Sequence, residues 1–203
     1  MKTRNYRIIV LGVLLVVTGV LTARAMLGSS FKPFYIYHDK NSKNHFTPSG
    51  YMPDGRCVAI DDAWRYNVKN GRTCMRIRFD AECSSDRQKW AGVYWQDPPN
   101  NWGSVKGGFD LRGAQKLVFW ARSEKGGERI VEFKVGGIGP DQMYPDSASA
   151  SLKDVMLTRE WKEYAIDLRG KDLSHISGGF AWSTNMEVNP QGCVFYIDEV
   201  RFE

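Results

Sequence analysis

Hydrophobic and polar residues alternate with a period of two along most of the chain, in eight or so short runs. The side chains of a strand point to its two faces in turn, so each run predicts a β-strand. Gly, Pro, Asn and Asp separate the runs, and no segment has the 3.6-residue period of an amphipathic helix three turns long. The runs lie within residues 34–40, 57–62, 73–81, 90–96, 116–123, 129–137, 160–168, 178–185 and 193–203.

Short strands at this spacing, without intervening helices, are typical of two antiparallel sheets packed face to face. The sequence therefore predicts an all-β fold, an antiparallel β-sandwich of the jelly-roll kind, over residues 34–203. The segment 41–56 is rich in turn-forming residues and is expected to be a long ordered loop or a pair of turns. With 203 residues and no internal repeat, the chain is long enough for one domain with a full core.

The stretch 90–103, WAGVYWQDPPNNWG, has the most informative pattern in the chain. Its first seven residues alternate, so that Trp90, Tyr94 and Gln96 share one face of a strand and Ala91, Val93 and Trp95 share the other. Both faces carry large side chains, and few folds can bury all of them. One face is therefore expected to do something other than fill the core.

Two prolines follow this strand and remove two N–H donors, so residues 97–101 are expected to form a loop that projects Asn100, Asn101 and Trp102. Flat aromatic rings beside amide groups suit the faces and hydroxyl groups of sugar rings. The alternative is that the tryptophans pack at the edge of the core, as most tryptophans do.

The first 25 residues have the pattern of a secretory signal peptide: a basic start, fourteen mostly apolar residues without charge, and small residues at Ala23 and Ala25. The apolar run, residues 8–21, would rise only about 21 Å as a helix, which is short for a hydrocarbon core of roughly 30 Å. We expect cleavage after Ala25, export to the periplasm or the cell exterior, and a linker at 26–33. An uncleaved membrane anchor is the alternative.

Removal of this segment also removes four basic residues and no acid, which lowers the formal charge from +5 to +1. The basic character of the whole chain is thus mainly a property of the targeting segment. It gives no reason to expect a nucleic-acid partner.

Four cysteines in an exported chain predict at least one disulfide, although the three ways of pairing Cys57, Cys74, Cys83 and Cys193 cannot be ranked. Cys74 is the expected participant because it starts a regular strand. Zinc-type spacing is absent, since the histidines lie far from the cysteines in the sequence.

Three segments carry a resemblance to a known family: GGFDLRGAQKLVFWARSEKGGERIVEFKVGG (107–137), LTREWKEYAIDLRGKDLSHISGGFAW (157–182) and FYIDEVRFE (195–203). Together they resemble the galactose-binding-like jelly-roll domains, which include many carbohydrate-binding modules. The resemblance covers roughly residues 34–203. It implies the sandwich fold more strongly than it implies sugar binding, because the same fold also serves adhesive domains and assembly factors.

The last of these segments also predicts a β-bulge. Phe195 and Ile197 are two residues apart, whereas Val200 follows Ile197 by three, so all three can face inward only if the strand bulges at Asp198 and Glu199. A bulge frees carbonyl oxygens beside a carboxylate, and such oxygens suit calcium. The resemblance implies one structural calcium ion near the terminal strands, with Asp198 as a ligand and Asp39 as its expected partner. The alternative is that both acids are solvated.

No catalytic motif is found in the sequence, and neighbouring acids such as Asp61 and Asp62 point to opposite faces of a strand. We therefore predict a non-catalytic domain that binds an oligo- or polysaccharide. A structural or protein-interaction domain of the cell envelope, with its tryptophans in the core, is the main alternative, and a glycan-active enzyme is a third. The residues predicted to bind sugar are Tyr94, Trp95, Gln96, Asn101, Trp102, Trp182 and Asn185, with Trp90 and Tyr94 as the alternative platform if their face is the exposed one.

Overall fold

The computed structural model describes residues 31–53, 55–83 and 89–203. The predicted signal or anchor segment and most of the predicted linker lie outside these ranges. Within them, no helix is long and apolar enough to cross a membrane.

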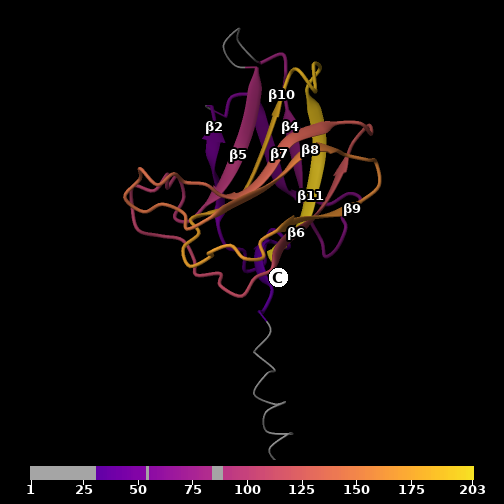
Figure 1. Ribbon diagram of the computed structural model, residues 1–203. Helices are drawn as coiled ribbons and strands as arrows, with labels where there is room; N and C mark the ends of the chain where they lie inside the picture. Colours follow the sequence, from indigo (N-terminus) through magenta and orange to yellow (C-terminus); the bar gives the residue numbers. More distant parts are fainter. Residues whose placement is uncertain (1–30, 54, 84–88) are drawn as a thin grey trace, which may run out of the picture. The chain divides into compact units, whose positions relative to one another are not determined.

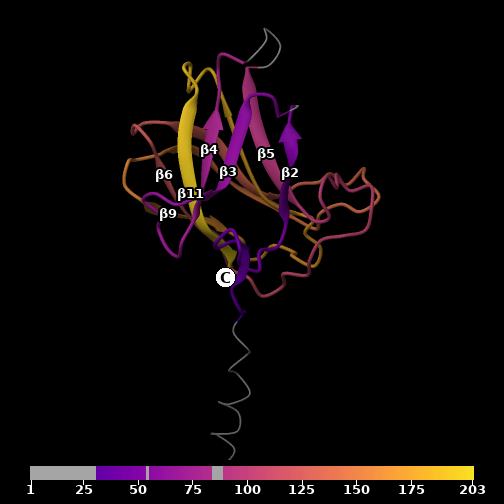
Figure 2. The same ribbon diagram turned by 180° about the vertical axis from the view of Figure 1, so that it is seen from behind.

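In the described part of the chain, eleven antiparallel strands form two sheets that face each other (Figures 1 and 2). The strands are β1 (Phe34–Tyr37), β2 (Thr47–Met52), β3 (Val58–Trp64), β4 (Cys74–Phe79), β5 (Trp90–Gln96), β6 (Lys116–Ser123), β7 (Arg129–Gly136), β8 (Ser149–Met156), β9 (Lys162–Asp167), β10 (Gly178–Asn185) and β11 (Cys193–Phe202). One sheet has the order β3-β4-β11-β6-β9, with β1 also paired to β11, and the other has the order β2-β5-β10-β7-β8. The predicted all-β sandwich is confirmed.

The two strands that the sequence pattern did not predict are the edges of the five-stranded sheet, β2 and β8. The first contains Pro48 and Gly50 and the second is largely polar, with burial on few positions. An edge strand pairs on one side only and tolerates proline, so neither strand needs the hydrophobic alternation of a central strand.

Aromatic rings from both sheets meet between them and form the centre of the core. Phe119 of β6 lies 4.6 Å from Phe133 of β7 and 5.3 Å from Phe180 of β10, measured between ring centroids. Trp182 of β10 meets Phe195 of β11 edge to face at 5.0 Å. All of these side chains are buried. Such pairs contribute about 0.5 to 1.5 kcal/mol each beyond the burial of their area, so this layer fixes how the sheets face each other.

The predicted bulge in the last strand is confirmed. The pairing of β11 with β6 shifts register between Asp198 and Arg201, and Glu199 has a φ of 54°. Phe195, Ile197 and Val200 are all buried as a result.

The prediction of at least one disulfide is confirmed, but its expected participant was wrong. Cys57 is bonded to Cys83, and Cys74 and Cys193 are free and buried. Cys57 precedes β3 and Cys83 follows β4, two paired neighbours, so the bond joins the same end of both strands. Cys74 lies at the other end of β4, beyond the reach of either.

We expect removal of the disulfide by Cys57→Ser to lower the free energy of unfolding by about 3 to 4 kcal/mol, because the bond restricts the unfolded chain over 26 residues. Burial raises the pKa of the Cys74 and Cys193 thiols to about 12, so these thiols should react only after denaturation. Thiol titration of the denatured, unreduced protein should therefore find two thiols. Four thiols in protein from its native compartment would contradict the assignment.

Candidate functional site

A groove on the outer face of the five-stranded sheet is the candidate site. Its cavity has a volume of about 230 Å³. Strand alternation places Trp90, Gly92 and Tyr94 of β5 on this face, opposite Ser183 and Ala181 of β10. Residues of β2, β7 and two loops complete it, so that the lining consists of Met52, Trp90, Tyr94, Trp102, Glu132, Lys134, Gly137, Ala181, Trp182 and Ser183.

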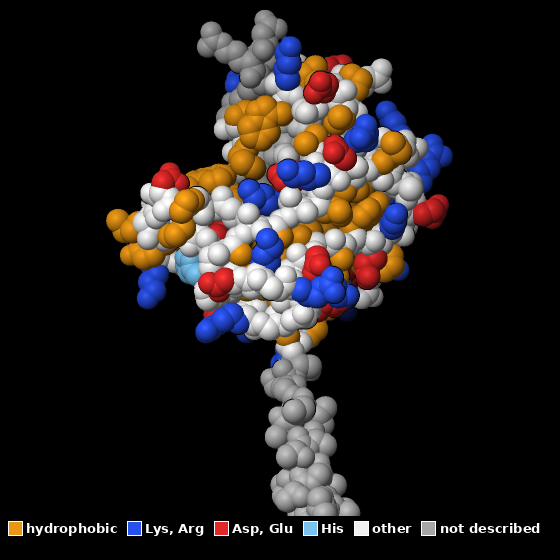
Figure 3. Space-filling model, viewed as in Figure 1, with side chains coloured by type: hydrophobic (Ala, Val, Ile, Leu, Met, Phe, Trp, Pro, Cys, Tyr) orange, Lys and Arg blue, Asp and Glu red, His pale blue; other side chains and the backbone are white. Residues whose placement is uncertain are grey.

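Two tryptophans in this groove are accessible to a ligand. Trp90 is 40% exposed and Trp102 is 42% exposed, which is high for side chains of this size. Figure 3, which looks onto this side of the molecule, shows hydrophobic side chains gathered over β2 and β5 and on the loops beside them, with charged groups between them. The groove therefore offers flat apolar surface within a polar face.

Tyr94 lies beneath these rings and is only 5% exposed. Its hydroxyl donates a hydrogen bond to the carbonyl oxygen of Gly136, and its ring lies 5.7 Å from that of Trp102 at an angle of 52°. Burial, followed by the negative charges of Asp146 and Glu132, raises the pKa of Tyr94 well above 10.0. Tyr94 therefore stays neutral and supports Trp102 from below.

The floor of the groove is kept low by two glycines. A Cβ atom on Gly92 would lie 3.1 Å from Cε of Met52 and 3.3 Å from Cβ of Ser183, and it would also press on the backbone of β10. A Cβ atom on Gly50 would lie 2.9 Å from the Trp102 ring. Larger residues at these positions would fill the floor or displace Trp102.

The loop that carries Trp102 is held by side chains that sequence reasoning had assigned to sugar binding. Asn101 is 1% exposed, donates to the carbonyl oxygen of Val105 at 2.9 Å, and accepts from the N–H of Gly103 at 3.0 Å. Gln96 is fully buried and donates to the carbonyl oxygen of Asn101 at 2.9 Å. These two amides position the loop and have no polar group left to face a ligand.

The other predicted residues also need correction. Trp95 and Trp182 are each 1% exposed and lie in the core, where Trp95 packs against Phe180 at 5.4 Å and Trp182 against Phe195. Their rings present no face to a sugar, so the core alternative is right for these two. Asn185 accepts the N–H groups of Glu187 and Val188 and so closes the turn after β10.

Of the seven predicted residues, the structure brings Tyr94 and Trp102 together at the groove. It also exposes Trp90, which had been the alternative platform with Tyr94. Sequence reasoning missed the charged residues Glu132 and Lys134, although the alternation of β7 assigns both of them to one face. The sequence pattern does not show which face of each strand is exposed to solvent.

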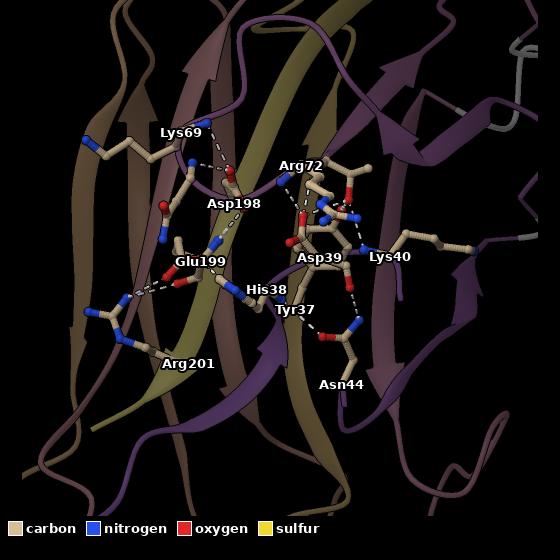
Figure 4. Close-up of polar contacts among 12 residues, drawn as sticks. Tyr37, His38, Asp39, Lys40, Asn44, Lys69, Arg72, Asp198, Glu199 and Arg201 are labelled. Atoms are coloured by element: carbon tan, nitrogen blue, oxygen red, sulfur yellow. Dashed lines mark hydrogen bonds and ion pairs between the residues drawn. The ribbon is translucent and has the colours of Figure 1, made fainter. Parts of the chain in front are cut away.

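The predicted calcium ligands have a different environment from the one expected (Figure 4). Both oxygens of the fully buried Asp198 accept backbone N–H groups, those of Lys69 and Asn70 on one oxygen and that of Glu199 on the other. Asp39 accepts the N–H groups of Arg72 and Thr73. Thus Asp198 holds the middle and Asp39 the C-terminal end of one loop, residues 65–73, which we call the capping loop.

N–H groups that point at a carboxylate compete with a cation for its oxygens, so Asp198 and Asp39 do not fit the oxygen-rich shell that calcium requires. Among the described residues, no group of three or more His, Cys, Asp or Glu side chains could hold a metal ion. Further contacts hold the capping loop in place: Lys69 lies over the ring of Trp120 at 3.7 Å, and Trp161 donates to the carbonyl oxygen of Asn67 at 2.9 Å. The loop thereby covers part of the outer face of the six-stranded sheet.

Comparison with known proteins finds similar folds among solved structures but no match among family models or curated proteins. No protein family model matches the sequence, and no curated protein matches it. Solved structures do match. The family 30 carbohydrate-binding module of a cellulosomal cellulase of Clostridium thermocellum has a TM-score of 0.50 and 15% identity, over 85% of this chain and 97% of that one. The fold is that of this module.

Another similar structure is a variant of a family 29 carbohydrate-binding module in complex with mannohexaose, with a TM-score of 0.48 and 11% identity. It covers 84% of this chain and 90% of that one. At 15% identity the likeness to the family 30 module is one of fold, and it agrees with the resemblance seen in the sequence.

The stability of tryptophan variants should distinguish the tryptophans of the core from those at the surface. We expect Trp95→Ala and Trp182→Ala each to lower the free energy of unfolding by about 3 to 5 kcal/mol, since each leaves a large cavity in the core. Trp90→Ala and Trp102→Ala should each change it by less than about 1 kcal/mol, because these rings are partly solvated. Urea unfolding measures the difference. Equal losses at all four positions would contradict the assignment of the exposed pair.

Asp198 should give the protein a pH-dependent stability. Burial raises its pKa from 3.8 to about 7, against the lowering by the N–H groups of Asn70, Glu199 and Lys69. A carboxyl group whose pKa is higher in the folded state binds its proton more tightly there. Its contribution to stability is therefore greatest below about pH 4 and is lost as the pH rises towards 7.

Asp198→Asn, which removes the titration, tests this expectation. The free energy of unfolding of the wild type relative to the variant should fall by up to about 4 kcal/mol from pH 4 to pH 7, at about 1.4 kcal/mol per pKa unit. The negative charge of Glu199, which adds to the raised pKa of Asp198, is present in both proteins. Parallel pH profiles would show that the carboxyl group of Asp198 titrates normally.

Proposed function

We propose that the protein is a non-catalytic carbohydrate-binding domain that holds an oligo- or polysaccharide in the groove of the five-stranded sheet. The observation that carries this proposal is the pair of exposed rings, Trp90 and Trp102, at one groove with a floor kept low by glycines. A tryptophan ring stacked on a sugar excludes water from the C–H groups of the sugar face. The fold shared with a carbohydrate-binding module agrees with this role.

Polar groups around the rings suit the hydroxyl groups of a sugar. Ser183 supplies a hydroxyl, Lys134 an ammonium group, and Glu132 a carboxylate that lies 3.9 Å from the ammonium group of Lys153. Donors and acceptors thus lie beside apolar surface, as in other small-molecule sites. An uncharged oligosaccharide needs both kinds of contact.

The number and the partners of the acidic side chains near the groove favour binding of a sugar over its hydrolysis. Among the described residues, Glu132 is the one acid in the groove lining, whereas glycoside hydrolysis commonly uses two carboxyl groups. Other acids in nearby loops have structural partners: Asp146 accepts N–H groups of Ile138, Ser177 and Gly178, and Asp97 accepts that of Gly108.

Export of the protein is part of the proposal. The disulfide supports it, because such bonds persist in oxidising compartments. The signal-peptide pattern of residues 1–25 points to the same location.

The test is a glycan array with the full chain, followed by calorimetric titration of the best ligand. We expect Trp90→Ala and Trp102→Ala each to weaken binding by about 1 to 3 kcal/mol, by analogy with the stacking of bases on aromatic side chains. Melting temperatures should stay close to that of the wild type. Tyr66→Ala is the matched control, because Tyr66 is a 73% exposed aromatic residue that follows β3 of the other sheet.

If no glycan binds, the groove is a protein-interaction surface or a purely structural feature, and the envelope-domain alternative stands. If a glycan binds equally well to all three variants, its site lies elsewhere on the domain.

A further inference from the structure

A second cavity lies on the six-stranded sheet, beside the ends of β1, β3 and β4. It has a volume of about 530 Å³, within the usual range for small-ligand sites. Its walls are the turn that follows β1 and the capping loop. The lining residues are Asp39, Lys40, Asn41, Ser42, Arg65, Arg72 and Thr73.

Hydrogen bonds hold both walls, so the cavity is formed before any ligand arrives (Figure 4). Asn44 accepts the N–H of His38 and donates to the carbonyl oxygen of Asp39, which fixes the turn. Oδ1 of Asp39 accepts the N–H groups of Arg72 and Thr73 at 2.8 and 2.7 Å, which fixes the capping loop against the turn. A preformed site loses little conformational entropy when it binds.

Positive charge dominates the lining. Its described residues include three cations, Lys40, Arg65 and Arg72, and one acid, Asp39. Lys40 is paired with Asp62 at 2.5 Å. Over the described ranges of the chain, neither guanidinium group, that of Arg65 or that of Arg72, has an ion-pair or hydrogen-bond partner. Two unpaired guanidinium groups at one cavity are therefore available to a ligand.

We propose that this cavity binds an oxyanion, a carboxylate, sulfate or phosphate group, between Arg65 and Arg72. A guanidinium group presents paired N–H donors in a plane, and this geometry matches two oxygens of such an anion. Asn41 and Ser42 add a neutral amide and a hydroxyl to the same lining. The oxyanion comes either as a free ion or as part of an acidic sugar, such as a uronic acid.

The site is independent of the groove on the other sheet, and it does not require that the groove binds sugar. Both arginines are exposed, so their attraction for an anion is screened by salt. We therefore expect the affinity to fall steeply as the ionic strength is raised.

The experiment titrates the full chain at fixed ionic strength with inorganic sulfate, with a uronic-acid hexasaccharide, and with a neutral hexasaccharide. Calorimetry or NMR shifts of the capping loop measure binding. We expect Arg65→Gln and Arg72→Gln each to weaken oxyanion binding about tenfold, the loss typical of one charge-assisted contact. Arg169→Gln is the matched control, because Arg169 is an exposed arginine paired with Asp167 at 2.7 Å beyond β9.

Comparison of the three ligands shows whether the bound oxyanion is a free ion or part of an acidic sugar. Tighter binding of the acidic hexasaccharide than of sulfate shows that the oxyanion belongs to an acidic glycan, and equal affinities indicate a free ion. Absence of binding by both overturns the proposal, as does binding that persists in the double variant of Arg65 and Arg72.

Further controls keep the two sites apart. Unchanged melting temperatures show that the arginine variants are folded. Trp90→Ala and Trp102→Ala should leave sulfate binding unchanged, and the arginine variants should leave binding of a neutral glycan unchanged. Loss of sulfate binding in the tryptophan variants would place the anion in the groove instead.

Discussion

The aromatic layer between the two sheets is the contact on which the rest of the structure depends. Trp95, Phe180 and Trp182 project from β5 and β10 towards Phe119 and Phe195 of the other sheet. Because adjacent residues of a strand point to opposite faces, placing these rings inside puts their neighbours outside. Tyr94, Ala181 and Ser183 therefore face away from the core, and the groove follows from the packing of the sandwich.

The same constraint explains which parts of the fold and site could be predicted from the sequence. Alternation identified the central strands, because each has one hydrophobic face. It failed for β2 and β8, where an edge position relaxes that requirement. Alternation also sorted the residues of β5 into two sets, Trp90 with Tyr94 and Val93 with Trp95, but both sets are large and aromatic. Which set is buried depends on the sheet that packs against β5. The sequence alone therefore could not decide which of the two sets faces a ligand.

The amides and acids were misjudged for a related reason. An asparagine beside a proline-rich loop can face a ligand or can satisfy the backbone of its own loop, and the sequence is the same in both cases. Asn101 and Gln96 do the second, because a loop without regular hydrogen bonding must find partners for its buried N–H and carbonyl groups. Asp198 and Asp39 likewise accept N–H groups of the capping loop. The bulge in β11 was correctly predicted, but bonds within the chain occupy the oxygens of Asp198.

Core packing and hydrogen bonds within the chain leave only a few side chains on each sheet able to contact a ligand. These side chains are aromatic on one sheet and charged on the other. On the five-stranded sheet the free groups are rings, Trp90 and Trp102, above a floor of small residues. On the six-stranded sheet the capping loop covers Trp120 and donates its N–H groups to Asp39 and Asp198, which leaves the guanidinium groups of Arg65 and Arg72 at its two ends. One sheet therefore offers stacking and the other offers charge. A ligand that needs both would have to reach around the sandwich, so the two surfaces are suited to separate ligands or to distant parts of one polymer.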